Sequence, residues 1–161
     1  MADVTPLAET LLEYARKRGI MVACAESCTG GMVATAITDW AGSSAIFDRG
    51  FVTYTNAAKI ALLNVKPVTL EAYGAVSEEV AAEMARGALA NSDATIAVSI
   101  TGIAGPGGSE HKPEGRVCFG AATANDCQTE TVEFGALGRA KVRVAARDHA
   151  LQLLINTCER I

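Results

Sequence analysis

Residues 20–40, with the sequence IMVACAESCTGGMVATAITDW, decide the fold of this chain. Residues 20–25 form a short apolar run that contains a β-branched residue, which predicts a buried strand. Residues 29–40 place Met32, Val33, Ala36 and Ile37 on one helical face, which predicts a helix. A buried strand that passes directly into a helix through a polar, glycine-bearing turn is typical of an α/β protein.

The rest of the chain repeats this alternation. Thr5 and Pro6 open a helix that Gly19 ends, and residues 47–55 predict a second strand with Asn56 as the cap of the next helix. Two short helices ending near Leu63 and Tyr73 follow, and Ser77 opens a longer one. Strands are predicted at 95–101, 116–124 and 129–134, and a last helix from about Arg139 to the end. Interleaved elements followed by a strand pair predict an α/β fold, a three-layer α/β/α sandwich with a mixed, mostly parallel sheet, in one domain over residues 1–161.

Composition limits the function classes. Half of the 161 residues are hydrophobic but only 5% are aromatic, so the core must consist of small aliphatic side chains. The net charge of -4 and the lack of a basic stripe argue against nucleic acid as a bulk partner. No 18-residue apolar run or signal-peptide pattern is present, so we expect a cytoplasmic protein with no membrane contact. The five cysteines lack zinc spacing, which indicates free thiols. We therefore expect no metal, and no cofactor either.

Two glycine-bearing loops follow predicted strands, where ligands bind in open α/β sheets. In the first, ESCTGG at 26–31, Ser27 is aimed outward and Thr29, Gly30 and Gly31 open a helix whose amides can hold an anion. Ser27 or Thr29 can equally be a simple helix cap. In the second, TGIAGPGG at 101–108, Thr101, Gly102 and Gly105 suit ligand contact, but a structural turn explains its Gly and Pro equally well.

Three cationic side chains and one thiol are further candidates. Lys59 stands among alanines and an isoleucine, so burial can lower its pKa and make it a base; the alternative is a solvated helix lysine. Arg139 and Arg143 share a helix face and suit phosphate, or form a solvated pair. Cys28 is the one plausible thiol nucleophile, since a helix N-terminus stabilises a thiolate.

Several of these stretches together resemble the C-terminal domain family of the competence/damage-inducible protein CinA. The similar stretches are AESCTGG at 25–31, GSS at 42–44, YTNAAK at 54–59, GAVS at 74–77 and TGIAGP at 101–106. Members that consist of this domain alone resemble nicotinamide mononucleotide deamidases, whereas longer members carry a pyrophosphatase-like N-terminal domain. The resemblance implies a serine–lysine hydrolase in which Ser27 is the nucleophile, Lys59 the base and Tyr54 a partner in proton transfer. Two positions depart from the pattern: Leu137-Gly138-Arg139 lacks the usual acid, and Glu114 stands where an apolar residue is expected.

The resulting hypothesis is that Ser27 attacks the carboxamide of a small nucleotide while Lys59 removes its proton, directly or through Tyr54. Amides after Ser27 would hold the oxyanion or the phosphate, and the loop 101–108 would hold the ribose phosphate or ring with Arg139 or Arg143. Two rivals are a non-catalytic nucleotide-binding module and a competence or DNA-damage partner protein. A homo-oligomer, most simply a dimer, is expected because closed two-fold dimers are the commonest assembly.

Overall fold

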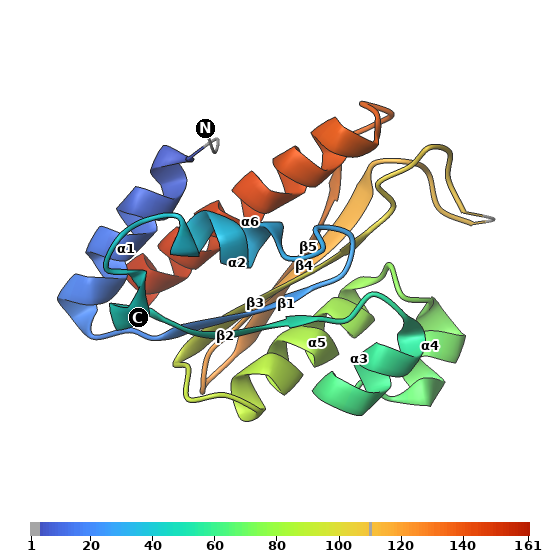
Figure 1. The fold of residues 1–161 in the computed structure, drawn as a ribbon. Helices are drawn as coiled ribbons and strands as arrows, with labels where there is room; N and C mark the ends of the chain where they lie inside the picture. Colours follow the sequence, from blue (N-terminus) through green and yellow to red (C-terminus); the bar gives the residue numbers. More distant parts are fainter. Residues whose placement is uncertain (1–3, 110) are drawn as a thin grey trace.

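The computed structural model describes residues 4–109 and 111–161, and its centre is a five-stranded sheet (Figure 1). The strands stand in the order β2-β1-β3-β4-β5, and their bounds are β1 Val22–Glu26, β2 Phe47–Val52, β3 Ile96–Gly102, β4 Arg116–Ala122 and β5 Cys127–Glu133. β1 is parallel to β2 and β3, whereas β4 is antiparallel to β3 and to β5. All strands except β4 therefore run in one direction, and the predicted mixed sheet is confirmed.

Helices cover both faces of this sheet (Figure 1). One face carries α1 Pro6–Arg18, α2 Met32–Thr38 and α6 Arg139–Arg160, and the other carries α3 Asn56–Leu63, α4 Pro67–Tyr73 and α5 Glu78–Ala90. A short 3₁₀ turn, Ser43–Ala45, precedes β2. The three-layer α/β/α sandwich is confirmed. None of the helices in the described ranges combines the length and apolar character that crossing a bilayer requires.

The two faces of the central strands differ in side-chain size. On β3, Ile96, Val98 and Ile100 pack under α1, α2 and α6, whereas Ala97 and Ser99 face α5. Ser99 Oγ donates a 2.5 Å hydrogen bond to the carbonyl oxygen of Ala81 in α5. Small residues let a helix backbone approach a sheet closely. α5 therefore packs directly on the sheet, and the outer helices α3 and α4 pack against α5.

Element ends follow the local chemistry. The Thr5 hydroxyl caps α1 by accepting a hydrogen bond from Leu7 N at 3.3 Å, as predicted. α2 begins at Met32 rather than at residue 29, because Gly30 and Gly31 have φ values of 56° and 106°, outside the helical region. β2 ends at Val52, before the predicted residue 55. The cap of α3 is then the Thr55 side chain and not the predicted Asn56.

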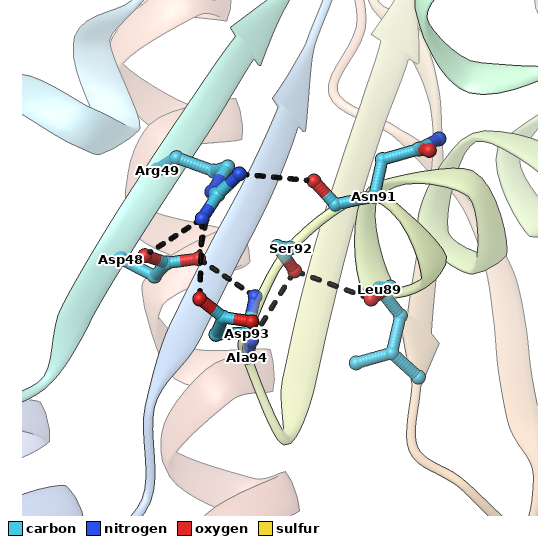
Figure 2. A network of polar contacts seen from close by, with 7 residues as sticks. All are labelled: Asp48, Arg49, Leu89, Asn91, Ser92, Asp93 and Ala94. Carbon is cyan, nitrogen blue, oxygen red and sulfur yellow. Dashed lines mark hydrogen bonds and ion pairs between the residues drawn. The ribbon is translucent and has the colours of Figure 1, made fainter.

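A polar network fastens the edge strand β2 to the turn between α5 and β3 (Figure 2). Arg49 Nε lies 2.7 Å from Asp48 Oδ2, and Arg49 Nη2 lies 3.4 Å from Asp93 Oδ2. The Asp93 amide also donates to Asp48 Oδ2 at 2.8 Å, and the Arg49 guanidinium lowers the pKa of the Asp48 carboxyl. The network lies at the amino ends of the parallel strands, so it aligns β2 from the end opposite to the polar loops.

Candidate active site

The carboxyl ends of β1 and β3 open into a cavity of about 370 Å³. Five segments line the cavity: the turn after β1, the connection between β2 and α3, the loop that precedes α5, the glycine loop after β3, and the start of α6. Of the residues that the sequence predicts for the site, the cavity brings together Ser27, Lys59, Tyr54, Thr101, Gly102, Gly105 and Arg139. Segments that are far apart in sequence therefore meet where an open α/β sheet is expected to bind its ligand.

Ser27 and Lys59 are in direct contact at the floor of this cavity. Ser27 follows β1 immediately, and its amide donates to Ile100 O at 2.9 Å, which fixes the turn against β3. Lys59 extends from α3, which the Thr55 cap orients. The Lys59 Nζ atom lies 3.0 Å from Ser27 Oγ, and only 1% of the lysine is exposed. The alternative of a solvated helix lysine is therefore wrong.

The surroundings of Lys59 favour its neutral form. Burial lowers the pKa of the Lys59 amine, and within the described part of the chain no carboxylate forms an ion pair with it. Its other acceptors are the carbonyl oxygens of Thr53 at 2.9 Å and Tyr54 at 3.5 Å. A neutral amine has two N–H groups for these two carbonyls and one lone pair. In the structure Lys59 Nζ donates to Ser27 Oγ. When the amine loses a proton, two N–H groups can stay on the two carbonyls, and the lone pair is then free to accept the serine proton.

Glu26, which the sequence analysis missed, is the buried anchor of the same turn. Its Oε1 accepts hydrogen bonds from Gly31 N at 3.2 Å and Val33 N at 2.9 Å, and its Oε2 accepts from Ala34 N at 3.0 Å. The first amides of α2 therefore bind a carboxylate of the protein itself. This finding corrects the expectation that they hold the oxyanion or the phosphate. The available signal was a Gly-Gly helix start without a capping side chain, directly after a strand that ends in an acid.

Replacing Glu26 with Ala is expected to destabilise the fold by about 3 kcal/mol, because three buried or part-buried amides lose a charged acceptor. Urea unfolding followed by circular dichroism measures this change. Glu13→Ala, on the exposed side of α1, is the matched control and should stay within about 0.5 kcal/mol of the parent. A Glu26→Ala protein as stable as the control would show that the carboxylate does not anchor the turn.

Four predicted substrate contacts, Thr29, Gly30, Gly31 and Arg143, lie outside the residues that line the cavity. Arg143 instead supports the turn from behind, since its Nε donates to Cys28 O at 3.1 Å and its Nη2 donates to Thr29 O at 3.2 Å. Of the two arginines, Arg139 is the one that reaches the cavity. The helical spacing of Arg139 and Arg143 could not show that one contacts the cavity wall and the other contacts the turn after β1.

Arg139 also determines the position of Tyr54. Arg139 Nη2 donates to the Tyr54 hydroxyl at 2.7 Å, and Arg139 Nη1 donates to Gly105 O, also at 2.7 Å. The Tyr54 ring is largely exposed at the cavity wall. Since Ser27 and Lys59 already touch, proton transfer between them needs no intermediate group, and the geometry favours the direct route over the route through Tyr54.

Cys28 lines the cavity beside Ser27 but is a poor nucleophile in this environment. Burial raises the pKa of its thiol to about 11, so the reactive thiolate is scarce at neutral pH. The expectation that the helix N-terminus stabilises a thiolate here is contradicted: burial and the nearby Glu26 raise the pKa of the thiol, and the opposing effect of the nearby cations Arg143 and Lys59 is smaller.

The glycine loop after β3 forms the opposite wall. Thr101 Oγ1 donates to Ala75 O at 2.9 Å, which joins β3 to the segment before α5. A Cβ on Gly102, the last residue of β3, would lie 2.6 Å from the Val117 side chain and 3.0 Å from Arg116 O, so the end of β3 can lie this close to β4 only with a glycine. Within residues 4–109 and 111–161, no group of three or more His, Cys, Asp or Glu side chains is arranged to hold a metal ion.

Sequence comparison identifies a family model and several known proteins that are similar to this chain. The model of the family described as CinA C-terminal domain matches residues 4–158. Nicotinamide-nucleotide amidohydrolase PncC of Escherichia coli K12 is 51% identical over 154 residues, which are 95% of this chain and 93% of that protein. The protein of the same name from Enterobacter agglomerans is 64% identical over 108 residues, 66% of each chain. A CinA-like protein of Chloroherpeton thalassium is 56% identical over 120 residues, but these are 74% of this chain and only 29% of that longer protein.

Solved structures agree with these matches. A competence/damage-inducible protein from Agrobacterium tumefaciens superposes with a TM-score of 0.90 at 45% identity, covering 97% of this chain and 98% of that chain. A CinA superfamily protein from Escherichia coli superposes with a TM-score of 0.92 at 36% identity, covering 98% of this chain and 93% of that chain. The resemblance carried by the short motifs is thus confirmed over nearly the whole length, and the chain belongs to the CinA C-terminal domain family.

Proposed function

We propose that this chain is a nicotinamide-nucleotide amidohydrolase, which converts nicotinamide mononucleotide and water to nicotinate mononucleotide and ammonia. The observation that carries the proposal is the 3.0 Å contact between Ser27 Oγ and the buried Lys59 Nζ at the floor of the cavity. The amidohydrolase names of the relatives in Escherichia coli and Enterobacter agglomerans support the same chemistry. The Ser/Lys mechanism is our inference from this contact together with the family resemblance.

The reaction proceeds in two halves. Neutral Lys59 takes the Ser27 proton as Oγ attacks the carboxamide carbon, and the resulting ammonium returns a proton to the departing ammonia. Water then attacks the acyl-serine while Lys59 accepts a proton from it. The lysine ammonium returns this proton to Ser27 Oγ as the acyl–oxygen bond breaks, which releases the nicotinate product and restores the neutral amine. The amide of Cys28, which lines the cavity, is the candidate for the oxyanion, since Glu26 occupies the amides of Gly31, Val33 and Ala34.

The substrate extends from Ser27 toward the glycine loop and Arg139. A cavity of about 370 Å³ is in the range of small-ligand sites. Arg139 offers a planar, fully charged guanidinium at the cavity wall, which suits a phosphate. Thr101, Gly102 and Gly105 contact the substrate from the loop, whereas Thr29, Gly30, Gly31 and Arg143 act by shaping the turn that carries Ser27.

Ammonia release from nicotinamide mononucleotide, measured in a coupled assay, tests the proposed activity. We expect turnover that persists in EDTA, because serine supplies the nucleophile and lysine transfers the protons. Loss of turnover in EDTA with recovery on adding zinc would contradict the Ser/Lys mechanism. Nucleotide binding without any ammonia release would favour the non-catalytic module, and retention of DNA on a filter at low salt would favour the competence-associated partner. The homodimer remains a prediction.

A further inference from the structure

The glycine loop after β3 is held from two sides by side chains of opposite charge. Arg139 Nη1 donates to Gly105 O at 2.7 Å, and Gly107 N donates to Glu114 Oε1 at 2.5 Å. Gly105 has a φ of 97°, and the Glu114 carboxylate occupies the space that a Cβ on Gly105 would need. Glu114 is half-buried, so it is packed against the loop rather than extended into solvent.

The amide that Glu114 holds belongs to the cavity wall. Gly105 and Gly107 line the cavity, and backbone N–H groups of glycine-rich loops are typical ligands for phosphate. Among the side chains described as lining the cavity, Arg139 is the permanent cation, and none of them is acidic. Glu114 therefore brings a negative charge directly behind a wall that otherwise attracts anions.

We propose that Glu114 is a specificity-determining residue that weakens binding of the substrate phosphate. It thereby reduces the ratio of the affinity for a nucleotide to the affinity for the corresponding nucleoside. The inference rests on the proposed function. A phosphate at this loop meets a like charge behind the loop, and it must compete with a carboxylate for the Gly107 amide. A nucleoside lacks the phosphate and meets neither penalty.

The test uses binding, so that it does not depend on turnover. Titration calorimetry compares Ser27→Ala with Ser27→Ala/Glu114→Gln, using nicotinamide mononucleotide and nicotinamide riboside as ligands. Gln keeps an oxygen that accepts from Gly107 N but removes the charge. We expect the mononucleotide to bind about three- to tenfold more tightly to the double variant and the riboside to bind equally to both. In high salt the gain should shrink, because salt screens partly exposed charges.

Glu159→Gln in the Ser27→Ala background is the matched control. It removes the same charge at the far end of α6 from Arg139, and it should change the binding of neither ligand. An unchanged ratio of the two affinities in the Glu114→Gln protein would overturn the proposal. If both affinities changed by the same factor, Glu114 would only hold the loop in position. Failure of the mononucleotide to bind either variant would also overturn it. Ammonia release by the parent protein is read separately, so that failure of the proposed function is distinguished from failure of the Glu114 assignment.

Discussion

Ser27→Ala is expected to lower ammonia release from nicotinamide mononucleotide by roughly 10⁴- to 10⁶-fold, the range seen when a serine nucleophile is removed. The loss follows from chemistry, because the variant retains Lys59 and the cavity but has no atom to form the acyl intermediate. The fold should persist, since the Ser27 amide still donates to Ile100 O. Initial rates, with thermal unfolding as the test of integrity, measure both effects.

Cys28→Ala is the matched control for this variant. The two residues are adjacent and both line the cavity, so the two substitutions disturb the same turn. A thiol whose pKa is about 11 should not contribute a nucleophile, and we expect the variant to retain most of its activity. If Cys28→Ala were inactive while Ser27→Ala remained active, the two residues would have to exchange roles.

Lys59→Arg is expected to lower the rate by about 10³-fold or more, because arginine keeps the charge but cannot lose its proton in a protein. Lys59→Met, which keeps the length of the side chain without the amine, should be equally inactive. If Lys59 only attracted the substrate phosphate, Lys59→Arg would stay active and Lys59→Met would not. Steady-state rates of the two variants, measured side by side, therefore separate a base from a simple cation.

The pH profile of the parent protein tests the same role. In the proposed mechanism the active form is the neutral amine, so we expect the rate to rise with pH through one ionisation and to fall as Lys59 gains a proton. Burial lowers the pKa of Lys59, so this ionisation should lie below the usual value of a free lysine, about 10.4. A rate independent of pH over the range in which the protein stays folded would contradict a titrating base.

The architecture was predictable from sequence because its signals are local. Thr5, Pro6 and Gly19 delimit α1 by capping and positive φ, and the alternation of apolar runs with helical periods indicates the layers. The ends of elements were less predictable. Whether Gly30 and Gly31 continue a helix or precede it depends on their φ values, which glycine itself does not restrict.

The proposed catalytic pair could be suspected from sequence, but the contact between its two side chains could not be predicted there. Spacing alone left Lys59 as a solvated lysine and Ser27 as a cap, because their 3.0 Å contact depends on how α3 packs against the end of β1. The family resemblance identified both residues without supplying their geometry. Glu26 escaped notice for a related reason: an acid at a strand end becomes a buried anchor only when a particular helix start lies above it.

Glu26 and Ser27 are neighbours in the chain, yet they serve opposite layers of the sandwich. The Glu26 carboxylate binds α2 on one face of the sheet, and the Ser27 hydroxyl contacts Lys59 of α3 on the other. Because side chains alternate along a strand, inserting or deleting one residue within β1 would exchange the two faces. For protein engineering, the consequence is that the six-residue motif 26–31 cannot be grafted as a loop. A recipient scaffold would need a helix start above the strand, a lysine-bearing helix below it, and the same register between them.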